Sequence, residues 1–223
     1  WYGGPPILEY LENVDASDHQ NENDFRFPVQ YVVRPDLDFR GFAGSVLSGA
    51  VKKGDRVRVL PSRKESTVKA IVTYDGDLEE AFAPQAGVIV LEDEIDISSG
   101  DMIVHANNLP NVTNQFEAVL VWMNEAALST GTPYILRQAG RNTKATVGKV
   151  SYRIDVNTLQ KSDNVTLGLN EIGKVTVFAT QPIFHDPYSK NRETGGFVLI
   201  DAITNTTVAA GMITEGVVSD PPI

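Results

Sequence analysis

Apolar and polar residues alternate with a period of two along most of this chain, which is the pattern of β-strands. From Phe25 onward, these runs are short and are separated by clusters of Gly, Pro, Asp and Ser. Short runs at regular spacing are typical of an antiparallel barrel or sandwich. The pattern predicts a first series of strands at 29–33, 44–51, 56–60, 67–74, 87–91 and 102–105, and a second at 115–123, 133–138, 144–156, 171–180, 196–201 and 207–213. Residues 158–169 have no clear pattern.

One short helix is predicted before the strands begin. In residues 5–12, Ile7, Leu8 and Leu11 fall on one side at helical spacing, and the proline at the start is tolerated there. Residues 13–24 are polar and acidic, as in a linker. The predicted fold class is therefore all-β, with two antiparallel β-barrels behind a short N-terminal helix. The expected division is a helix and acidic linker at 1–23, a first barrel at 24–108, a second barrel at 112–214 and a C-terminal linker at 215–223.

Composition and charge narrow the possible functions of these barrels. The 223 residues contain no cysteine, which excludes disulfides, thiolate chemistry and cysteine-ligated metals. The net charge is −10, and residues 1–23 contain five acids and no Lys or Arg. This balance argues against nonspecific nucleic-acid binding. Because no apolar run approaches the ~18 residues of a membrane span, we expect a cytoplasmic protein. Trp1 at the start suggests a segment of a larger protein.

Candidate catalytic groups are few. His19, His105 and His185 lie far apart in sequence. His185 followed by Asp186 could be a base with an orienting carboxylate, but a loop histidine bonded to local backbone is the favoured interpretation. The acidic run 92–96 could bind a hard cation, yet its spacing favours a solvated loop. The glycines of 41–54 lack the context of a phosphate-binding loop and indicate turns. We therefore expect no catalytic, cofactor-binding or metal-binding residue in this chain.

Two stretches carry a family resemblance. Residues 39–55 (FRGFAGSVLSGAVKKGD) resemble the first barrel after the G domain in elongation-factor-like GTPases, through Arg40-Gly41, Lys52-Lys53 and Gly54-Asp55. Residues 188–213 (YSKNRETGGFVLIDAITNTTVAAGMI) resemble the end of the large subunit of bacterial sulfate adenylyltransferase, and the N-terminal WYGGPPILEYLENV resembles the junction where the G domain of that family ends.

The resemblance implies two barrels of the translation-elongation-factor type, without the G domain. It implies a large subunit that hydrolyses GTP, with GTP and Mg²⁺ in the missing G domain. It also implies a small catalytic subunit that makes adenosine 5′-phosphosulfate from ATP and sulfate, and in some members a downstream adenylylsulfate kinase domain. The barrels alone would be non-catalytic, relaying the nucleotide state and docking the small subunit.

Two further expectations follow. The alternative interpretation is the barrel pair of a translation-elongation GTPase that binds aminoacyl-tRNA; the near-neutral second barrel and the 188–213 stretch argue against it. If exposed residues make contacts, the candidates are Arg40 and Phe42 in the first barrel and Arg192 and Glu193 in the second, because arginine and aromatic side chains often anchor interfaces. Ordinary turn residues are an equally good interpretation of these four.

Overall fold

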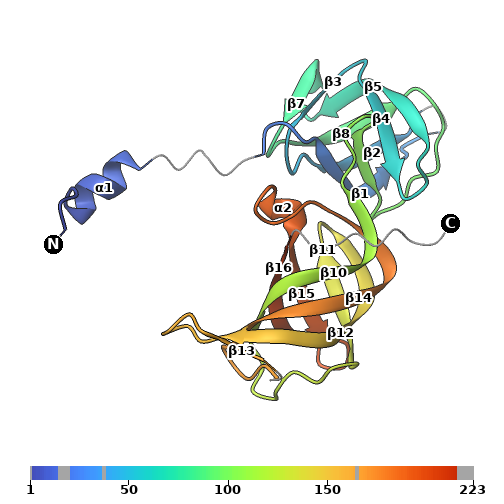
Figure 1. Ribbon diagram of the computed structural model, residues 1–223. Helices are drawn as coiled ribbons and strands as arrows, with labels where there is room; N and C mark the ends of the chain where they lie inside the picture. The colour runs from blue at the N-terminus through green and yellow to red at the C-terminus, as the bar shows by residue number, and fades with distance from the viewer. Residues whose placement is uncertain (1, 15–20, 37–38, 164–165, 215–223) are drawn as a thin grey trace.

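Two antiparallel β-structures follow each other along the chain, as a computed structural model shows (Figure 1). The structure describes residues 2–14, 21–36, 39–163 and 166–214. The predicted linker at 215–223 and residues 15–20 of the predicted linker at 13–24 lie outside these residues. Helix α1 (Ile7–Asn13) begins two residues later than predicted, and its side chains are all exposed. No helix in the described part of the chain is long and apolar enough to cross a membrane.

The first barrel closes six strands in the order β4-β9-β1-β2-β8-β5, because β4 also pairs with β5. Strand β6 extends this sheet, and β3 pairs with β7 in a small separate ribbon. The strands are β1 (Arg26–Val33), β2 (Gly41–Ser45), β3 (Ala50–Lys52), β4 (Arg56–Leu60), β5 (Glu65–Thr73), β6 (Gly76–Leu78), β7 (Glu80–Phe82), β8 (Ala86–Leu91) and β9 (Met102–His105). Closure buries one continuous core and leaves few free edges.

The second barrel closes six strands in the order β11-β15-β16-β10-β14-β12, through pairing of β11 with β12. Strand β13 adds a short ribbon to β12, and the four-residue helix α2 precedes β15. The elements are β10 (Asn111–Trp122), β11 (Pro133–Gln138), β12 (Arg141–Ile154), β13 (Lys161–Ser162), β14 (Ile172–His185), α2 (Arg192–Gly195), β15 (Gly196–Asp201) and β16 (Thr207–Ile213). The predicted fold class is confirmed.

Several predicted strands have the wrong extent, and for two of them the structure shows the reason. The predicted strand at 44–51 is two strands, β2 and β3, because Gly49 adopts a left-handed φ of 66° and turns the chain between them. The strand predicted at 171–180 continues to His185, because β14 pairs with β12 up to Ala179 and again with β10 from Ile183. The interruption at Gln181-Pro182 resembles a strand end in the sequence, whereas here it is an irregularity within one strand.

Candidate functional site

The most elaborate group of polar side chains lies where the two barrels meet. It begins with β1, in which alternate side chains point to opposite faces. Phe25 and Phe27 point into the core of the first barrel, so Arg26 between them points out of it, towards the second barrel. Arg26 is nevertheless fully buried. A buried guanidinium requires partners for its donors, and the second barrel supplies the main one.

Arg26 forms a two-pronged ion pair with Asp186, which follows β14. Arg26 Nε donates to Asp186 Oδ2 at 2.9 Å and Arg26 Nη2 donates to Asp186 Oδ1 at 2.9 Å. Thr194 of α2 donates its hydroxyl to Asp186 Oδ2 at 2.8 Å. Arg26 Nη1 donates to the carbonyls of Phe25 and Asn108, each at 3.0 Å. The ion pair thus joins residues that are 160 positions apart in the sequence, and nearly every donor and acceptor of its two side chains has a hydrogen-bond partner.

Asp24 is the centre of a second group at the same junction. Its carboxylate accepts hydrogen bonds from Asn21 and Asn108 and lies 3.0 Å from Lys190 Nζ. Burial alone would raise the pKa of Asp24, but these bonds and the Lys190 charge lower the pKa to about 2. Nearby, Asn191 Nδ2 donates to Ser48 Oγ at 2.8 Å, from the second barrel to the first. Because its pKa is low, the Asp24 carboxylate remains charged at neutral pH, and its hydrogen bonds fix the chain that enters the first barrel.

Apolar packing completes the junction. Leu60, Met102 and Val104 of the first barrel form one buried cluster with Phe184 of the second. Arg141 lies over the Phe184 ring, 4.9 Å from its centre, and donates to the Gly100 carbonyl at 3.1 Å. An apolar cluster and a satisfied ion pair in one interface favour a single docked arrangement of the barrels.

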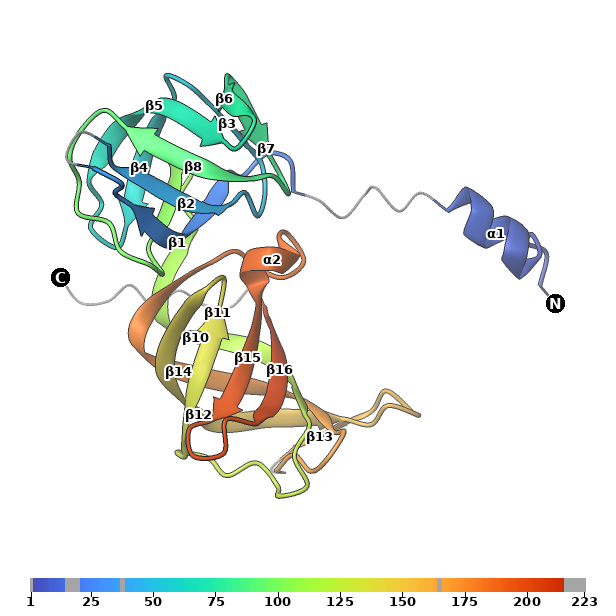
Figure 2. The same cartoon turned by 180° about the vertical axis from the view of Figure 1, so that it is seen from behind.

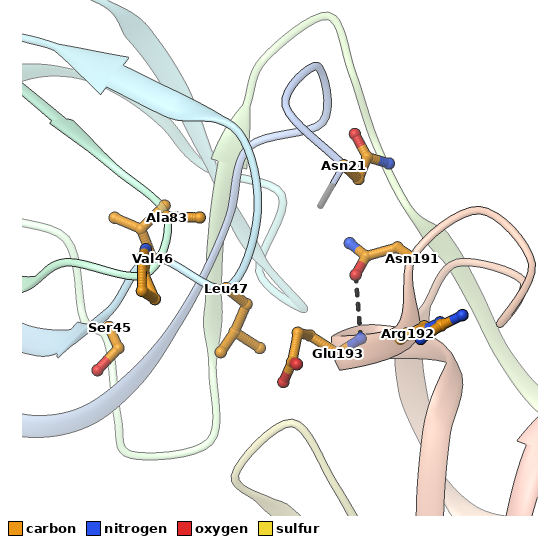
Figure 3. Close-up of a pocket in the computed structure, with 9 residues that line it drawn as sticks. Asn21, Ser45, Val46, Leu47, Ala83, Asn191, Arg192 and Glu193 are labelled. Carbon is orange, nitrogen blue, oxygen red and sulfur yellow. Dashed lines mark hydrogen bonds between the residues drawn. The ribbon is translucent and has the colours of Figure 1, made fainter. Parts of the chain in front are cut away.

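Beside this interface is a cleft with a volume of about 340 Å³ (Figure 3). Ser45, Leu47 and Pro84 line it from the first barrel, and Asn191 and Glu193 from the second. Asn191 caps α2 by accepting a hydrogen bond from the Glu193 amide at 3.1 Å, as asparagine commonly does at helix starts. Figure 3 shows the Glu193 side chain directed towards the first barrel, where Leu47 lies. The cleft could receive a protein segment.

The four predicted contact residues have different positions. Arg192 and Glu193 are exposed and line the cleft. Arg40 lies over the ring of Phe42 and pairs with Asp96 at 3.1 Å, away from the junction. The expectation that Phe42 is exposed is wrong: it is 1% exposed, because its position in β2 points into the barrel core. The structure brings Arg192 and Glu193 together and separates them from the other two.

His185 and Asp186 also differ from expectation. His185 ends β14 rather than lying in a loop, and it is only 4% exposed. Neither ring nitrogen has a hydrogen-bond partner among the described residues, and Phe116 packs against the ring. Asp186 is committed to Arg26, so the two do not form a base with an orienting carboxylate. Burial lowers the pKa of His185, an effect that Asp186 offsets only in part.

This burial predicts a pH dependence of stability. Below its ordinary pKa of about 6.5, His185 binds a proton more readily in the unfolded chain than in the folded one. The free energy of unfolding should therefore fall as pH falls from about 7 towards the lowered pKa of the folded state. His185→Gln should flatten this slope, measured by urea unfolding between pH 5 and pH 7. An unchanged slope in His185→Gln would contradict the assignment; His105→Gln, a half-exposed ring beside Asp55, is the matched control.

The sequence did not single out the junction residues Arg26, Asp24 and Asn108, and it marked Thr194 only as part of the family-like stretch 188–213. One signal was present: Arg26 is a lone charge inside the apolar run of Phe25, Phe27, Pro28 and Val29. Its partner could not be found in the same way, because nothing local links position 26 with position 186. Within the described residues no group of three His, Asp or Glu side chains could hold a metal ion.

Comparison with known proteins gives a consistent result. Residues 115–214 match the family described as GTP-eEF1A C-terminal domain-like. Sulfate adenylyltransferase subunit 1 of Alteromonas mediterranea is 52% identical over 99% of this chain, which corresponds to 47% of that protein. Subunit 1 of Bacteroides fragilis is 49% identical over 97% of the chain. The bifunctional enzyme CysN/CysC of Rhodopirellula baltica is 50% identical over 96% of the chain and 33% of its own length.

Solved structures show the same fold at much lower identity. The structure of Sup35 complexed with GDP has a TM-score of 0.79 over 97% of this chain and 53% of its own, at 20% identity. At that identity the likeness shows the fold alone. The chain spans about half the length of the subunit 1 relatives it matches.

Proposed function

Because this chain is homologous to about half of sulfate adenylyltransferase subunit 1, we propose that it is the barrel part of a GTP-hydrolysing subunit of that enzyme. In this role the barrels are not catalytic; they relay the nucleotide state of a G domain and dock the small catalytic subunit. The observation that carries the proposal is identity near 50% along almost the whole chain. The likeness to Sup35 is too distant to favour the alternative of an aminoacyl-tRNA-binding module.

The residues present do not fit GTP and Mg²⁺, so we place both in a G domain outside this chain. Of the residues that line the cleft between the barrels, only Arg192 is basic, and its neighbour Glu193 is acidic. A nucleotide site needs cationic groups or clustered amides at the phosphates and oxygen ligands for the metal. No step of catalysis is therefore assigned to this chain. We also propose that an adenylylsulfate kinase domain can belong to the same polypeptide, because one relative of this chain is a bifunctional enzyme.

The junction suggests how a relay would work. Rigid-body switching requires two states of packed elements that differ in their contacts with the ligand-bound domain. The docked barrels form one rigid support through Arg26 and Asp186, and the cleft at Arg192 and Glu193 lies open at its side. A neighbouring domain that contacts the cleft in one nucleotide state would engage both barrels at once. The small subunit would then sense the position of that domain against a fixed support.

Direct binding tests the docking part of this proposal. The chain should bind the small subunit from the same organism with a Kd in the micromolar range, measured by isothermal titration calorimetry. It should show no GTP turnover and no salt-sensitive binding of aminoacyl-tRNA. Absence of small-subunit binding at tens of micromolar would contradict the docking role, and robust GTP turnover would contradict the placement of the nucleotide.

A further inference from the structure

Exposed apolar side chains of the second barrel gather at one end. The described part of this barrel has six large apolar residues that are exposed, and five of them lie in the connections at the end opposite the first barrel. We call these five the distal rim: Met123, Val156, Leu159, Leu169 and Ile203. The sixth, Phe178, lies on the outer face of β14.

The strand directions establish that the rim is one end of the barrel. Strand β10 starts beside the junction and ends at Trp122, where it pairs with the start of β16 and, through Val121, the start of β14. Strand β15 likewise runs from α2 to Asp201, and β12 runs from Arg141, which contacts the first barrel, to Ile154. The described residues of the three connections, 123–132, 155–163 with 166–171, and 202–206, therefore all lie at the far end of the barrel, as both views show (Figures 1 and 2).

The most prominent part of the rim is the connection from β12 to β13, which projects from the barrel (Figure 2). Val156 is 59% exposed and Leu159 is 75% exposed. The turn is nevertheless firmly built: Asp155 Oδ1 accepts from the amides of Asn157 and Thr158 at 2.8 and 2.9 Å, and the Leu159 amide donates to the Asp155 carbonyl at 2.7 Å. These amide bonds also lower the pKa of Asp155, so its carboxylate stays charged.

Leu159 occupies this turn at a cost. Its φ is 59°, a left-handed conformation that branched and bulky side chains rarely adopt. Backbone strain of this kind is typical of functional sites. Single exposed apolar residues are common on protein surfaces and need no explanation. Here, however, five exposed apolar residues lie at one end of a barrel, and an ordered turn holds one of them outward in a strained conformation. This arrangement is not the scattered exposure of an ordinary surface.

Charge and position indicate what covers the rim. The three connections contain four acidic residues, Glu125, Asp155, Asp163 and Glu171, and one basic residue, Lys161. Glu171 is paired with Arg153, and the ammonium of Lys161 lies over the Tyr152 ring. A complementary surface is therefore apolar with a basic border. The first barrel is docked on the opposite end, so the rim is left for a different body.

We propose that the distal rim is the surface on which the other subunit of sulfate adenylyltransferase docks, through an apolar face bordered by lysine and arginine. This inference rests on the proposed function, because the name subunit 1 of the relatives implies at least one further subunit. Val156 and Leu159 enter the partner's apolar face, and the acidic side chains around them face its cations. The cleft at Glu193 remains free for the nucleotide-dependent contact.

A binding series tests this surface. The probe is the purified small subunit, titrated against the wild-type chain, against Val156→Ser/Leu159→Ser, and against Tyr74→Ser as the matched control. Tyr74 is fully exposed on the first barrel, outside the rim. We expect the double variant to bind at least ten-fold more weakly and Tyr74→Ser to bind as the wild type does, because buried apolar anchors dominate interface energies. Ile203→Ser provides a second rim variant if the double variant loses its cooperative unfolding.

The outcomes separate the two proposals. If the wild-type chain binds and the rim variants bind within two-fold of it, the rim proposal is wrong and the proposed function stands. If the wild-type chain does not bind, the rim proposal and the docking part of the proposed function are both wrong. Light scattering tests the other possible occupant of the rim, a second copy of this chain. If the wild-type chain is a dimer and the rim variants are monomers, the rim binds a second copy and the proposal is wrong.

Discussion

Replacing Arg26 with methionine is expected to destabilise the chain by about 3–5 kcal/mol, the range found when one partner of a buried ion pair is removed. The variant leaves the Asp186 carboxylate buried, with the Thr194 hydroxyl as its remaining side-chain partner. Methionine fills a similar volume and keeps the side chain flexible, so loss of charge rather than a cavity is the main effect. Urea unfolding measures the change, with the free energy of each transition evaluated separately if the barrels unfold in two steps.

Arg56→Met is the matched control for this change. Arg56 pairs with Glu65 at 2.8 Å on an exposed surface, so its loss should cost no more than about 1 kcal/mol. Arg26→Met combined with Asp186→Asn should cost less than the sum of the two single changes, because the double variant has no uncompensated buried charge. Equal losses in Arg26→Met and Arg56→Met would show that the ion pair does not hold the barrels together.

Replacing Gly49 with alanine is expected to cost about 2–5 kcal/mol, from left-handed backbone strain together with overpacking. Its φ is 66°, and an added Cβ would lie 2.6 Å from the Phe25 backbone nitrogen and 2.7 Å from the Asp24 carbonyl carbon. Backbone cannot yield as a flexible side chain can. The clash would also displace Asp24 and Arg26, so the junction should loosen along with the first barrel.

Gly54→Ala separates the contribution of left-handed backbone strain from that of overpacking. Gly54 also has a left-handed φ, 92°, but nothing lies within 4 Å of a Cβ added there. Its substitution therefore reports the backbone term alone, about 1 kcal/mol. Thermal unfolding of the two variants should show a clearly lower Tm for Gly49→Ala. Equal Tm values would mean that the chain around Asp24 adjusts without cost.

Local patterns predicted the elements of this fold well where one strand face is buried and the other is not. The strands at 56–60, 102–105, 133–138, 196–201 and 207–213 have the predicted bounds, because turn residues end each run. The pattern failed for β2 and β3, which read as one run because Gly49 interrupts them without a polar cluster. It also missed β6 and β7, whose short segments carry mostly polar or exposed residues.

The local sequence pattern could not predict the junction or the distal rim, for a different reason. Each depends on which strand ends share one end of a closed barrel, and only the order and direction of the strands define that. Arg26 is detectable as an anomaly in an apolar run, but the sequence associates Asp186 only with its neighbour His185 and not with Arg26. Leu159 occurs in the ambiguous stretch 158–169, where no periodicity marks an exposed role, and Val156 is predicted as the last residue of the strand 144–156, which ends at Ile154.

The connection between the barrels has a further consequence. Only residues 106–110 join β9 to β10, so the two halves of the junction are tethered by a few residues. A short tether gives an effective concentration in the millimolar range. Contacts that are too weak to hold two separate proteins together at cellular concentrations can therefore keep these barrels docked. If a partner separates the barrels, they should dock again rapidly once that partner dissociates. Any separation of the barrels is therefore short-lived, and permanent separation requires cutting the chain.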